Sequence, residues 1–526
     1  MLLPWLFLSS LGPAFVLASM YCTTLDACWS SAQIWASLNT SVNRHRIAMC
    51  PPAAPCHVLD PLFDEEMCTA INASWTSLFF GADQPGATQG TYWENGNASC
   101  YIDFWLDTPC EQGLVMPIVL NAHSLEDVQK GALGHDFIGH TSGEGSFLIW
   151  TRHVQNLGRS SDLRAVADIL PEFVALGAPK GTKSVKAIRM GPGDGWANIY
   201  DLANRSDIVV VGGTGQTVSS TGGYVMGGGI SILFGLFLLM RFIDVLQFTL
   251  VDAFGKKVIA NAHQNSNLFW CSRGGGGGTF GVVTEVVHKT YPRYHNILAA
   301  TLTVSAPNST ELASVLKVYL DLQHSLNDAQ WWLTTAVQQT SFVLQAALFT
   351  PPVGVNLTQV AHEAFPSVIL AAQNLSMSPA FVVQEFPNFL AVHNMFFPPS
   401  SSGSPEVLAS HLIPCHVFEN TTAMTLLVQV VTEPFTVIFN LLAGGTDLKV
   451  SPHATSVNPG WRKALHLIIF ASGWTSSTPL SIWDTLRQTL LFWGDNYEHL
   501  LEMKCKFDPL GVFECPKCVG SEVFGS

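Results

Sequence analysis

The chain has 526 residues, and 48% of them are apolar. This length and composition allow two or three domains with their own hydrophobic cores and exclude a disordered polypeptide. Acidic residues outnumber basic ones by 39 to 25, so that the net charge is −14. Nucleic acid is therefore not an expected partner, because binding to successive phosphates requires clustered Lys and Arg.

Residues 1–18 are predicted to be a secretory signal peptide. Leu2 to Ala18 is apolar and closes on Val16, Leu17 and Ala18, which fits the small-residue rule for cleavage. Eight Asn-x-Ser/Thr sequons follow, at Asn39, Asn72, Asn97, Asn204, Asn308, Asn356, Asn374 and Asn420. Together they predict a secreted, extracellular glycoprotein.

Residues 19–111 are predicted to be a Cys-rich N-terminal extension braced by disulfides. Seven of the twelve cysteines lie there: Cys22, Cys28, Cys50, Cys56, Cys68, Cys100 and Cys110. Such density is typical of an oxidising compartment, and an odd number leaves one for a distant partner or a free thiol. At the other end, Cys515 and Cys518 form a C-x-x-C. A zinc site would need two more ligands, and the sequence has no second C-x-x-C to supply them. We therefore favour a disulfide there and expect no metal.

From residue 112 to 294 the chain has short β-branched runs separated by glycines. The predicted strands are Ser184–Arg189, Ile208–Val211, Val245–Val251 and Val282–Val287. Residues 295–490 are predicted to form a second, α+β domain, with strands at Ile297–Val304 and Leu426–Val431 and a helix at Thr310–Leu326. Residues 491–526 are a C-terminal segment, in which a helix over Asn496–Lys506 ends at Asp508-Pro509.

The segment from Ile208 to Met240 contains no charged residue, so that hydropathy alone would suggest a membrane helix. A membrane span needs about 20 consecutive apolar residues, and the strongly apolar part, Ile230 to Met240, is shorter and follows several glycines. We therefore favour a buried core element and expect no membrane partner. A membrane anchor is the alternative, which solubility without detergent after secretion would exclude.

Three glycine clusters lie in the 112–294 domain. They are Gly134-His135-Asp136-Phe137, the segment Val211–Gly229, and Arg273–Gly281. Glycine backbone can approach a ligand closely, and successive N–H groups can form an anion-binding concavity, so that a dinucleotide pyrophosphate is the expected guest. Gly276, Gly278 and Gly281 match G-x-G-x-x-G, but a Rossmann fold needs a helix next, and Val282–Val287 is strand-like.

These motifs resemble the FAD-linked oxidases with a PCMH-type FAD-binding domain, especially the secreted fungal relatives of berberine bridge enzyme. The resemblance is carried by residues 134–139 with Ser146–Trp150, by Gln216-Thr217-Val218 leading to Gly227-Gly228-Gly229, by Phe269-Trp270 before Arg273, and by Asn496-Tyr497 with Lys506–Pro509. It implies an α+β fold class: a two-part FAD-binding domain, a second α+β domain that binds substrate, and the disulfide-rich extension.

The resemblance also implies a flavin site and a reaction. His135 matches the histidine that binds the flavin 8α-methyl group covalently; an ordinary turn histidine is the alternative. Gly215 stands where some members have a second linking cysteine. The implied FAD-binding residues are His135, Gly134, Asp136, Gly139, Gln216, Thr217, Val218, Gly222, Gly223, Gly227, Gly228, Gly229, Gly278 and Gly281. The implied activity is oxidation of a small alcohol, sugar or secondary-metabolite precursor by hydride transfer to flavin, with molecular oxygen as the acceptor.

Three departures from the family pattern support a second hypothesis. No Asn-Glu-x-Asp segment precedes the C-terminal Asn-Tyr, so that we assign no catalytic base; Asp484 there is better explained as a solvated helix residue. Only five or six residues join Val128 to Gly134, where the family has a helix and a strand. Bulky apolar residues occupy positions 230–243, where relatives have polar ones. The alternative is therefore a non-catalytic secreted glycoprotein with a degenerate FAD-binding fold.

Overall fold

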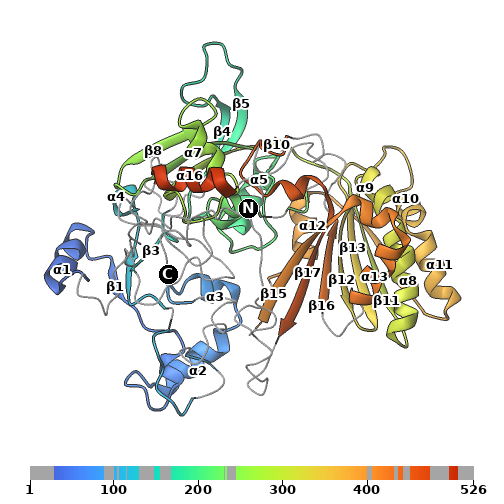
Figure 1. Ribbon diagram of the computed structural model, residues 1–526, viewed down its shortest axis with the longest axis horizontal. Coiled ribbons are helices and arrows are strands. Elements are labelled where there is room, and N and C mark those ends of the chain that lie inside the picture. The colour runs from blue at the N-terminus through green and yellow to red at the C-terminus, as the bar shows by residue number, and fades with distance from the viewer. Residues whose placement is uncertain are drawn as a thin grey trace, which may run out of the picture.

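The computed structural model describes residues 29–87, 100–102, 106–113, 115–128, 147–154, 167–229, 231–233, 244–399, 406–431, 436–441, 451–473 and 497–507. Figure 1 shows two large units side by side, with the N-terminal extension projecting from one of them. We call residues 112–294 the glycine-rich domain and residues 295–490 the seven-stranded domain, after the sheet that it contains. The C-terminal helix returns to the glycine-rich domain.

The N-terminal extension is more helical than its composition suggested. It contains α1 (Ala32–Ser41), β1 (Arg46–Ala48), η1 (Ala54–Cys56), α2 (Glu65–Ser74) and α3 (Leu78–Ala82). Ser31, Asp64 and Ser77 each cap a helix by accepting a backbone N–H, as expected for Ser and Asp at that position. The disulfides Cys56–Cys68 and Cys100–Cys110 confirm the predicted bracing. Cys50 is unpaired among the described residues, and Cys22 and Cys28 lie outside them.

The extension also adds a strand to the glycine-rich domain. β1 pairs with β2 (Ile118–Asn121), and β2 pairs in parallel with β3 (Phe147–Trp150), with α4 (Leu125–Val128) following β2. Among the described residues, this sheet has the order β1-β2-β3. The connection from Val128 to Gly134 lies outside the described residues.

Three histidine rings lie in contact where the extension meets this sheet, and two of them, His123 and His153, are stacked. His45 and His123 have ring centroids 4.6 Å apart, and His123 and His153 have centroids 5.0 Å apart. The buried carboxylate of Asp127 lies 3.6 Å from Nδ1 of His45 and accepts the backbone N–H of His123 at 3.0 Å. Nδ1 of His153 lies 2.7 Å from Oδ1 of Asn121. The histidines therefore join β1, β2 and β3 at one end of the sheet.

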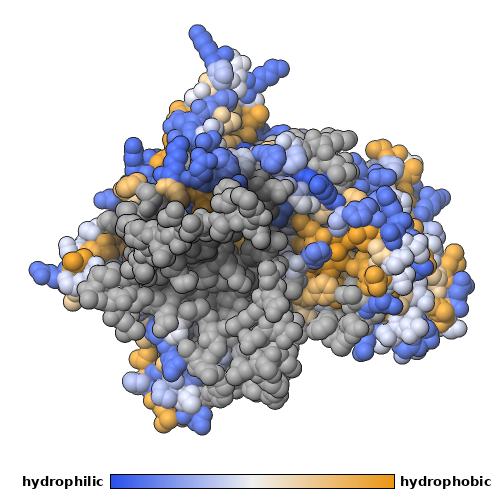
Figure 2. Space-filling model, in the orientation of Figure 1, coloured by the Kyte–Doolittle hydropathy of each residue, from blue (hydrophilic) through white to orange (hydrophobic). Residues whose placement is uncertain are grey.

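The rest of the glycine-rich domain is built on a five-stranded antiparallel sheet. Its order is β4 (Asp168–Phe173), β5 (Val185–Met190), β9 (Val282–Lys289), β7 (Val245–Val251) and β8 (Lys257–Asn261). The remaining elements are α5 (Trp196–Arg205), β6 (Ile208–Val209), α6 (Gly223–Gly227), α7 (Ser266–Cys271) and β10 (Tyr291–Pro292). The hairpin between β4 and β5 projects from the molecule and has a hydrophilic tip (Figure 2).

The seven-stranded domain contains one antiparallel sheet. Its order is β14 (Ala380–Phe386), β11 (Ile297–Ser305), β13 (Ser341–Leu348), β12 (Trp332–Gln338), β16 (Thr436–Leu441), β17 (Ala464–Gly473) and β15 (Glu406–Pro414). Around it lie α8 (Ser309–Asp321), α9 (Gln323–Asp328), α10 (Leu357–Ala364), α11 (Pro366–Asn374), α12 (Phe389–Phe396), η3 (Cys415–Glu419), α13 (Thr421–Val431) and η4 (Pro459–Arg462).

The two faces of this sheet have different neighbours. Alternate strand residues such as Leu302, Leu344 and Phe439 pack with α8, α11 and α13 in one apolar core. α12 instead packs against α5 of the glycine-rich domain, through Phe389 and Val392. The helices therefore cover one face, and the other is turned toward the glycine-rich domain.

Most of the predicted elements are present with small shifts of their ends. The strands β5, β6, β7, β9 and β11 confirm the five strand predictions they overlap, and a strand rather than a helix follows the glycines at Gly281. The C-terminal helix is α16 (Tyr497–Phe507). The predicted helix Thr310–Leu326 is interrupted at Leu322, between α8 and α9.

The prediction of a strand at Leu426–Val431 is wrong, because these residues belong to α13. Oδ1 of Asn420 accepts the N–H of Ala423 at 2.9 Å and caps the helix. Met424 and Val428, four residues apart, are buried in the core beneath α8. Local β propensity is overridden by this cap and by helical spacing of the buried residues.

For the apolar segment Ile208–Met240, the structure shows buried residues at Ile208–Val211, Ile232 and Leu233. Within the described ranges, no helix has both the length and the apolar character to cross a bilayer. Residues 234–243 lie outside the description.

Candidate functional site

Two of the three predicted glycine clusters lie side by side in the structure. The N–H of Gly276 donates to the carbonyl oxygen of Met226 at 2.9 Å. A Cβ placed on Gly277 would lie 3.9 Å from Cα of Gly223. Chain segments about 50 residues apart in sequence therefore form one surface. The third cluster, with Gly134, His135, Asp136 and Gly139, lies outside the described residues.

At several of the predicted FAD-binding positions, the fold itself requires glycine. A Cβ on Gly229 would lie 2.2 Å from the ring of Tyr224. Gly281 has φ +143°, and its Cβ would lie 2.6 Å from the carbonyl oxygen of Val251. Gly228 ends α6 in the left-handed conformation with φ 86°. At these three positions, packing or backbone conformation excludes a side chain whether or not a ligand binds.

Other glycines turn their backbone toward open space. No atom lies within 4 Å of a Cβ placed on Gly227 or Gly278, and Gly278 has φ +68°. At Gly277, only the Cα of Gly223 comes within that distance. Gly222 is the N-cap of α6, at the start of the same turn. These positions leave main chain accessible to a ligand that approaches closely.

Two buried hydroxyl groups lie between the predicted residues Val218 and Gly222. Ser220 and Thr221 are fully buried, and neither hydroxyl has a hydrogen-bond partner among the described residues. Oγ of Ser219 accepts the N–H of Gly222 at 3.2 Å and fixes the turn. A buried hydroxyl without a partner is costly, so that a ligand oxygen accepting from it would recover the lost hydrogen bond. Sequence reasoning missed both residues, although their position inside the cluster was a signal.

Asp194 joins this turn to the end of β5. Its carbonyl oxygen accepts the N–H of Ser220 at 2.9 Å, and its Oδ2 accepts the N–H of Gly191 at 2.7 Å. Burial raises the pKa of Asp194 to about 6, because desolvation outweighs the stabilising hydrogen bonds. Its Oδ1 has no partner in the part of the chain that the structure describes. Asp194 was also absent from the sequence-based prediction.

The predicted residues Gln216, Thr217 and Val218 position other elements. The carbonyl oxygens of Gln216 and Val218 accept N–H groups from the first turn of α5, at 3.0 and 3.2 Å. Nε2 of Gln216 donates to the carbonyl oxygen of Phe397 at 3.1 Å, and so connects the two domains. Nε2 of His393 lies 3.1 Å from the carbonyl oxygen of Thr214, and burial lowers the pKa of His393. This segment therefore links the glycine turns to the seven-stranded domain.

A cavity of about 410 Å³ lies at this junction. Thr214 and Ile232 line it from the glycine-rich domain, while Trp332, Thr334, Asn440 and Phe397 line it from the other. All of its described lining residues are uncharged. Its volume is within the range of small-molecule sites, about 300–1,000 Å³.

Elements near the C-terminus enclose the second glycine turn. Lys504 of α16 is 1% exposed, and its Nζ donates to the carbonyl oxygen of Thr279 at 3.1 Å. A Cβ on Gly275 would lie 2.6 Å from Cδ2 of Leu500. On the other side, the side chain of Val457 occupies the space beside Gly274, which has φ +112°. The turn is thus supported by chain segments from two other parts of the sequence.

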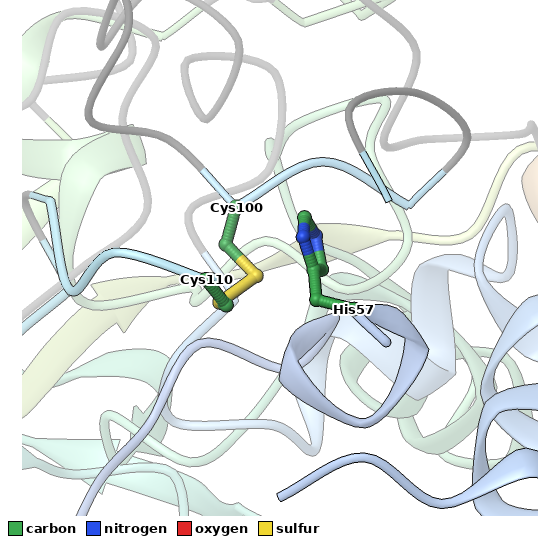
Figure 3. A group of neighbouring side chains, drawn as sticks. All are labelled: His57, Cys100 and Cys110. Atoms are coloured by element: carbon green, nitrogen blue, oxygen red, sulfur yellow. A yellow bond between two sulfur atoms is a disulfide. The ribbon is translucent and has the colours of Figure 1, made fainter. Parts of the chain in front are cut away.

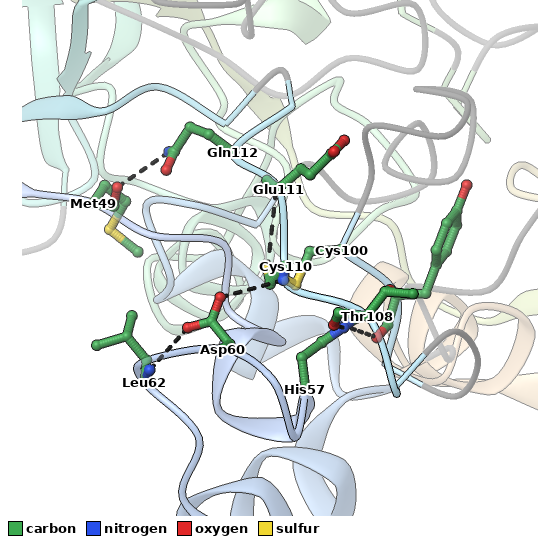
Figure 4. Close-up of a disulfide and its surroundings, with 10 residues drawn as sticks. Met49, His57, Asp60, Leu62, Cys100, Thr108, Cys110, Glu111 and Gln112 are labelled. Carbon is green, nitrogen blue, oxygen red and sulfur yellow. Dashed lines mark hydrogen bonds between the residues drawn. A yellow bond between two sulfur atoms is a disulfide. The ribbon is translucent and has the colours of Figure 1, made fainter.

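His57 and the disulfide Cys100–Cys110 form another compact group, in the N-terminal extension (Figure 3). The two sulfur atoms are bonded to one another, and the ring nitrogens of His57 face the carbonyl oxygens of Thr108 at 2.9 Å and Tyr101 at 2.7 Å. Figure 4 shows Asp60 accepting the N–H of Cys110 beside it. With its ligand atoms engaged, the group is structural.

The described residues fit the pyrophosphate of a dinucleotide. Open backbone at Gly227, Gly277 and Gly278 allows close approach, and the hydroxyls of Ser220 and Thr221 supply donors for anionic oxygens. The adjacent cavity places a small molecule next to the same segment. This arrangement suits a cofactor bound through its backbone contacts with a substrate alongside it.

The comparisons with known proteins agree with this geometry. No family model matches the chain. FAD-linked oxidoreductase ZEB1 of Gibberella zeae is 29% identical over 96% of this chain and 94% of the relative. The VAO-type flavoprotein MtVAO615 of Myceliophthora thermophila superposes with a TM-score of 0.82 at 22% identity, covering 95% and 97% of the two chains. A chitooligosaccharide oxidase superposes with a TM-score of 0.59 at 15% identity, covering 77% and 93%.

The fold is that of the VAO-type flavoproteins, with the predicted PCMH-type architecture. By sequence, the chain is a homologue of the FAD-linked oxidoreductases, and the resemblance and the class of enzyme inferred from the motifs are confirmed.

Proposed function

We propose that the protein is an FAD-dependent oxidase that removes a hydride from a small organic molecule, an alcohol, sugar or secondary-metabolite precursor, outside the cell. The observation that carries this proposal is the meeting of two open glycine turns beside the cavity between the domains. The turns hold the nucleotide part of the cofactor, and the cavity holds the substrate. When bound, FAD accepts the hydride, and molecular oxygen takes the electrons from it.

The chain contributes binding and positioning groups to this reaction. Open backbone at Gly227, Gly277 and Gly278 would hold the pyrophosphate, and Ser220 and Thr221 would donate hydrogen bonds to it. The seven-stranded sheet excludes water from the substrate and orients it, through the uncharged residues of the cavity. We assign no side chain as the base.

His135 is proposed to bind the cofactor covalently. The flavin methyl carbon would lose a proton and bond to a ring nitrogen of His135, and the two electrons left on the flavin would pass to molecular oxygen. This link would retain the cofactor in the dilute extracellular medium. A second link through residue 215 is not available, since that residue is glycine. A Cβ there would lie 2.8 Å from Cγ2 of Val218, so that a larger residue would require this side chain to shift.

Secretion and glycosylation are proposed on the signal-like residues 1–18 and the eight sequons. Seven of the sequon asparagines are described, and none of them is buried. Asn356 and Asn420 cap helices through Oδ1, which leaves Nδ2 as the atom for a glycan. Asn308 also caps a helix through Oδ1, but its Nδ2 donates to Oε1 of Glu311 at 3.0 Å, so a glycan there would replace that contact. The two disulfides of the extension are typical of proteins that fold in an oxidising compartment.

The test is the visible spectrum of the secreted protein before and after acid precipitation. We expect a redissolved pellet that keeps flavin absorbance in the wild type and in the control His263→Ala, an exposed histidine of the same domain. In His135→Ala, the flavin should stay in the supernatant. A colourless wild type would overturn the oxidase proposal, and pellet-bound flavin in His135→Ala would overturn only the covalent link.

The non-catalytic glycoprotein is the second candidate, favoured by the few residues that join Val128 to Gly134 in the sequence and by Ile232 at the cavity. Hydrogen peroxide release discriminates between the two. A yellow protein that releases hydrogen peroxide from none of a panel of alcohols and sugars supports the second candidate.

A further inference from the structure

We infer that the cavity between the domains selects an uncharged, largely apolar substrate that carries one or two oxygen acceptors, in preference to a sugar or an ionised metabolite. This inference rests on the proposed function, because it concerns the substrate of the same site. It follows from the arrangement of side chains on the open face of the seven-stranded sheet.

A row of polar side chains crosses this face beside the cavity. In the strand register, Thr334 of β12 lies opposite Gln345 of β13 on one side and opposite Asn440 of β16 on the other. Gln345 in turn lies opposite Thr301 of β11. Residues directly opposite one another on antiparallel strands project to the same side, so that these four form one continuous row. Three of them, Gln345, Thr334 and Asn440, line the cavity.

The neighbouring row is apolar. Ala336 lies opposite both Val343 and Ile438, and Ile438 lies opposite Ile469. All four line the cavity. On each strand, the apolar residue lies two positions from the residue at the level of the polar row. Trp332 and Phe397 border it on the other side, with ring centroids 5.9 Å apart. The polar row is therefore a narrow band between an apolar row and two aromatic rings.

The polar row has donors available for a ligand. Oδ1 of Asn440 accepts the hydroxyl of Thr334 at 3.0 Å, which leaves the Asn440 N–H groups for another acceptor. The carboxamide of Gln345 makes no side-chain hydrogen bond with any residue that the structure describes. Both amides can donate to a carbonyl, ether or hydroxyl oxygen of a ligand in the cavity.

This lining discriminates against other substrate classes. An ionised group would be buried among uncharged residues with no opposite charge in the described lining, which carries a large desolvation penalty. A sugar has a hydroxyl on nearly every carbon and would leave several without partners against Val343, Ala336, Ile438 and Ile469. An apolar molecule with an oxygen above the polar row satisfies both parts of the surface.

The test compares the binding of cinnamyl alcohol, cinnamate and cellobiose to the secreted holoenzyme by calorimetry without oxygen. We expect cinnamyl alcohol to bind at least about tenfold more tightly than either of the others. Equal or tighter binding of cellobiose or cinnamate would overturn the inference. The flavin is reduced with dithionite beforehand, so that it cannot accept a hydride and binding is read without turnover. Flavin content is measured separately, so that a failure of selectivity is distinguishable from a failure of the proposed oxidase.

Substitutions in the polar row and in the apolar row test whether the alcohol binds in this cavity. Ile438→Glu places a charge in the apolar row, and Asn440→Leu removes one donor at nearly constant size. We expect Ile438→Glu to abolish detectable binding of cinnamyl alcohol and Asn440→Leu to weaken it about threefold to tenfold, the value of one hydrogen bond. The matched control is Thr301→Val, in the same polar row but outside the cavity, which should leave binding unchanged.

The control variant also tests the location of the site. If Thr301→Val weakens binding as much as Asn440→Leu does, the alcohol is bound elsewhere on the sheet and the inference fails. Unchanged binding in Asn440→Leu, with a melting temperature like that of the wild type, would equally overturn it. Should Ile438→Glu fail to fold, Asn440→Leu and Gln345→Met carry the test.

Discussion

The glycine-rich domain forms its part of the site from main chain, and the seven-stranded domain forms its part from side chains. In the glycine-rich domain, the open main chain at Gly277 and Gly278 makes the binding surface. In the seven-stranded domain, the surface consists of side chains at alternate positions of regular strands, such as Thr334 and Asn440. A ligand surface made of backbone tolerates few changes in sequence, whereas one made of strand side chains can change its chemistry while the fold remains.

The largest expected effect concerns a glycine that the fold itself requires. We expect Gly281→Ala to lower the free energy of unfolding by about 3 kcal/mol, because the methyl group meets the carbonyl oxygen of Val251 in a backbone conformation that alanine rarely adopts. Gly181→Ala is the control: φ is +89° there, but the surrounding space is open, and about 1 kcal/mol is expected. Urea unfolding of both variants checks the difference, and equal losses would contradict it.

The second prediction concerns the buried carboxyl of Asp194, whose pKa is raised to about 6. A raised pKa means that the folded state binds the proton more tightly than the unfolded state, so that the contribution of Asp194 to stability is greatest below pH 4 and is lost as the pH rises through 6. Asp194→Asn stays neutral and keeps an acceptor for Gly191. It should exceed the wild type by about 2 kcal/mol at pH 7 and match it near pH 4, by denaturant titration. A pH-independent difference would refute this.

Substitutions of two buried threonines should distinguish an effect on FAD binding from an effect on stability. Thr221→Val removes a hydroxyl without a described partner, so we expect unchanged stability of the flavin-free protein and reduced FAD content. Thr335→Val in the other domain removes a hydroxyl that lies 2.7 Å from that of Tyr319. It should lower the free energy of unfolding by about 1 kcal/mol and leave FAD content unchanged. Melting measures stability, and the ratio of flavin absorbance to protein absorbance measures FAD content. The proposed contrast between the domains is wrong if Thr221→Val lowers stability and Thr335→Val lowers FAD content.

The smallest effect is expected at the stacked histidines. Burial, followed by repulsion from a neighbouring ring or guanidinium, lowers the pKa of His123 and His153. Lowered pKa values mean that this part of the fold is stable above the ordinary histidine pKa of about 6.5 and loses stability as the pH falls below it. Because His123 and His153 are exposed, the loss should stay below about 1 kcal/mol. Between pH 7 and pH 5, the melting temperature should drop less in His123→Gln than in the wild type. An equal drop in the two proteins would exclude the histidines as its cause.

This contrast between the domains also explains what could be predicted from sequence. Few residues can replace glycine where main chain must approach a ligand closely, so that the clustering of Gly222, Gly227 and Gly278 indicates a ligand surface from the sequence alone. The meeting of their segments was expected, but the sequence could not sort Gly281, needed for packing, from Gly278, which faces open space. That distinction depends on which atoms of distant strands lie beside each Cα.

The substrate surface could not be predicted in the same way. Thr334, Gln345 and Asn440 lie in ordinary alternating strands, and only the register of three strands places them in one row. Register is a property of pairing between distant segments and is not encoded by any short motif. The misassigned run Leu426–Val431 has the same origin, since its helical cap and its buried face became apparent only with the core around them.

The support of the second glycine turn by Lys504 and Leu500 has a consequence for biosynthesis. Because α16 begins only at Tyr497, the turn at Gly274–Thr279 remains without its supporting helix until the ribosome has passed that point. Cofactor capture should then follow synthesis of α16, and a nascent chain stalled before residue 497 would be colourless even if the five-stranded and seven-stranded sheets had already formed.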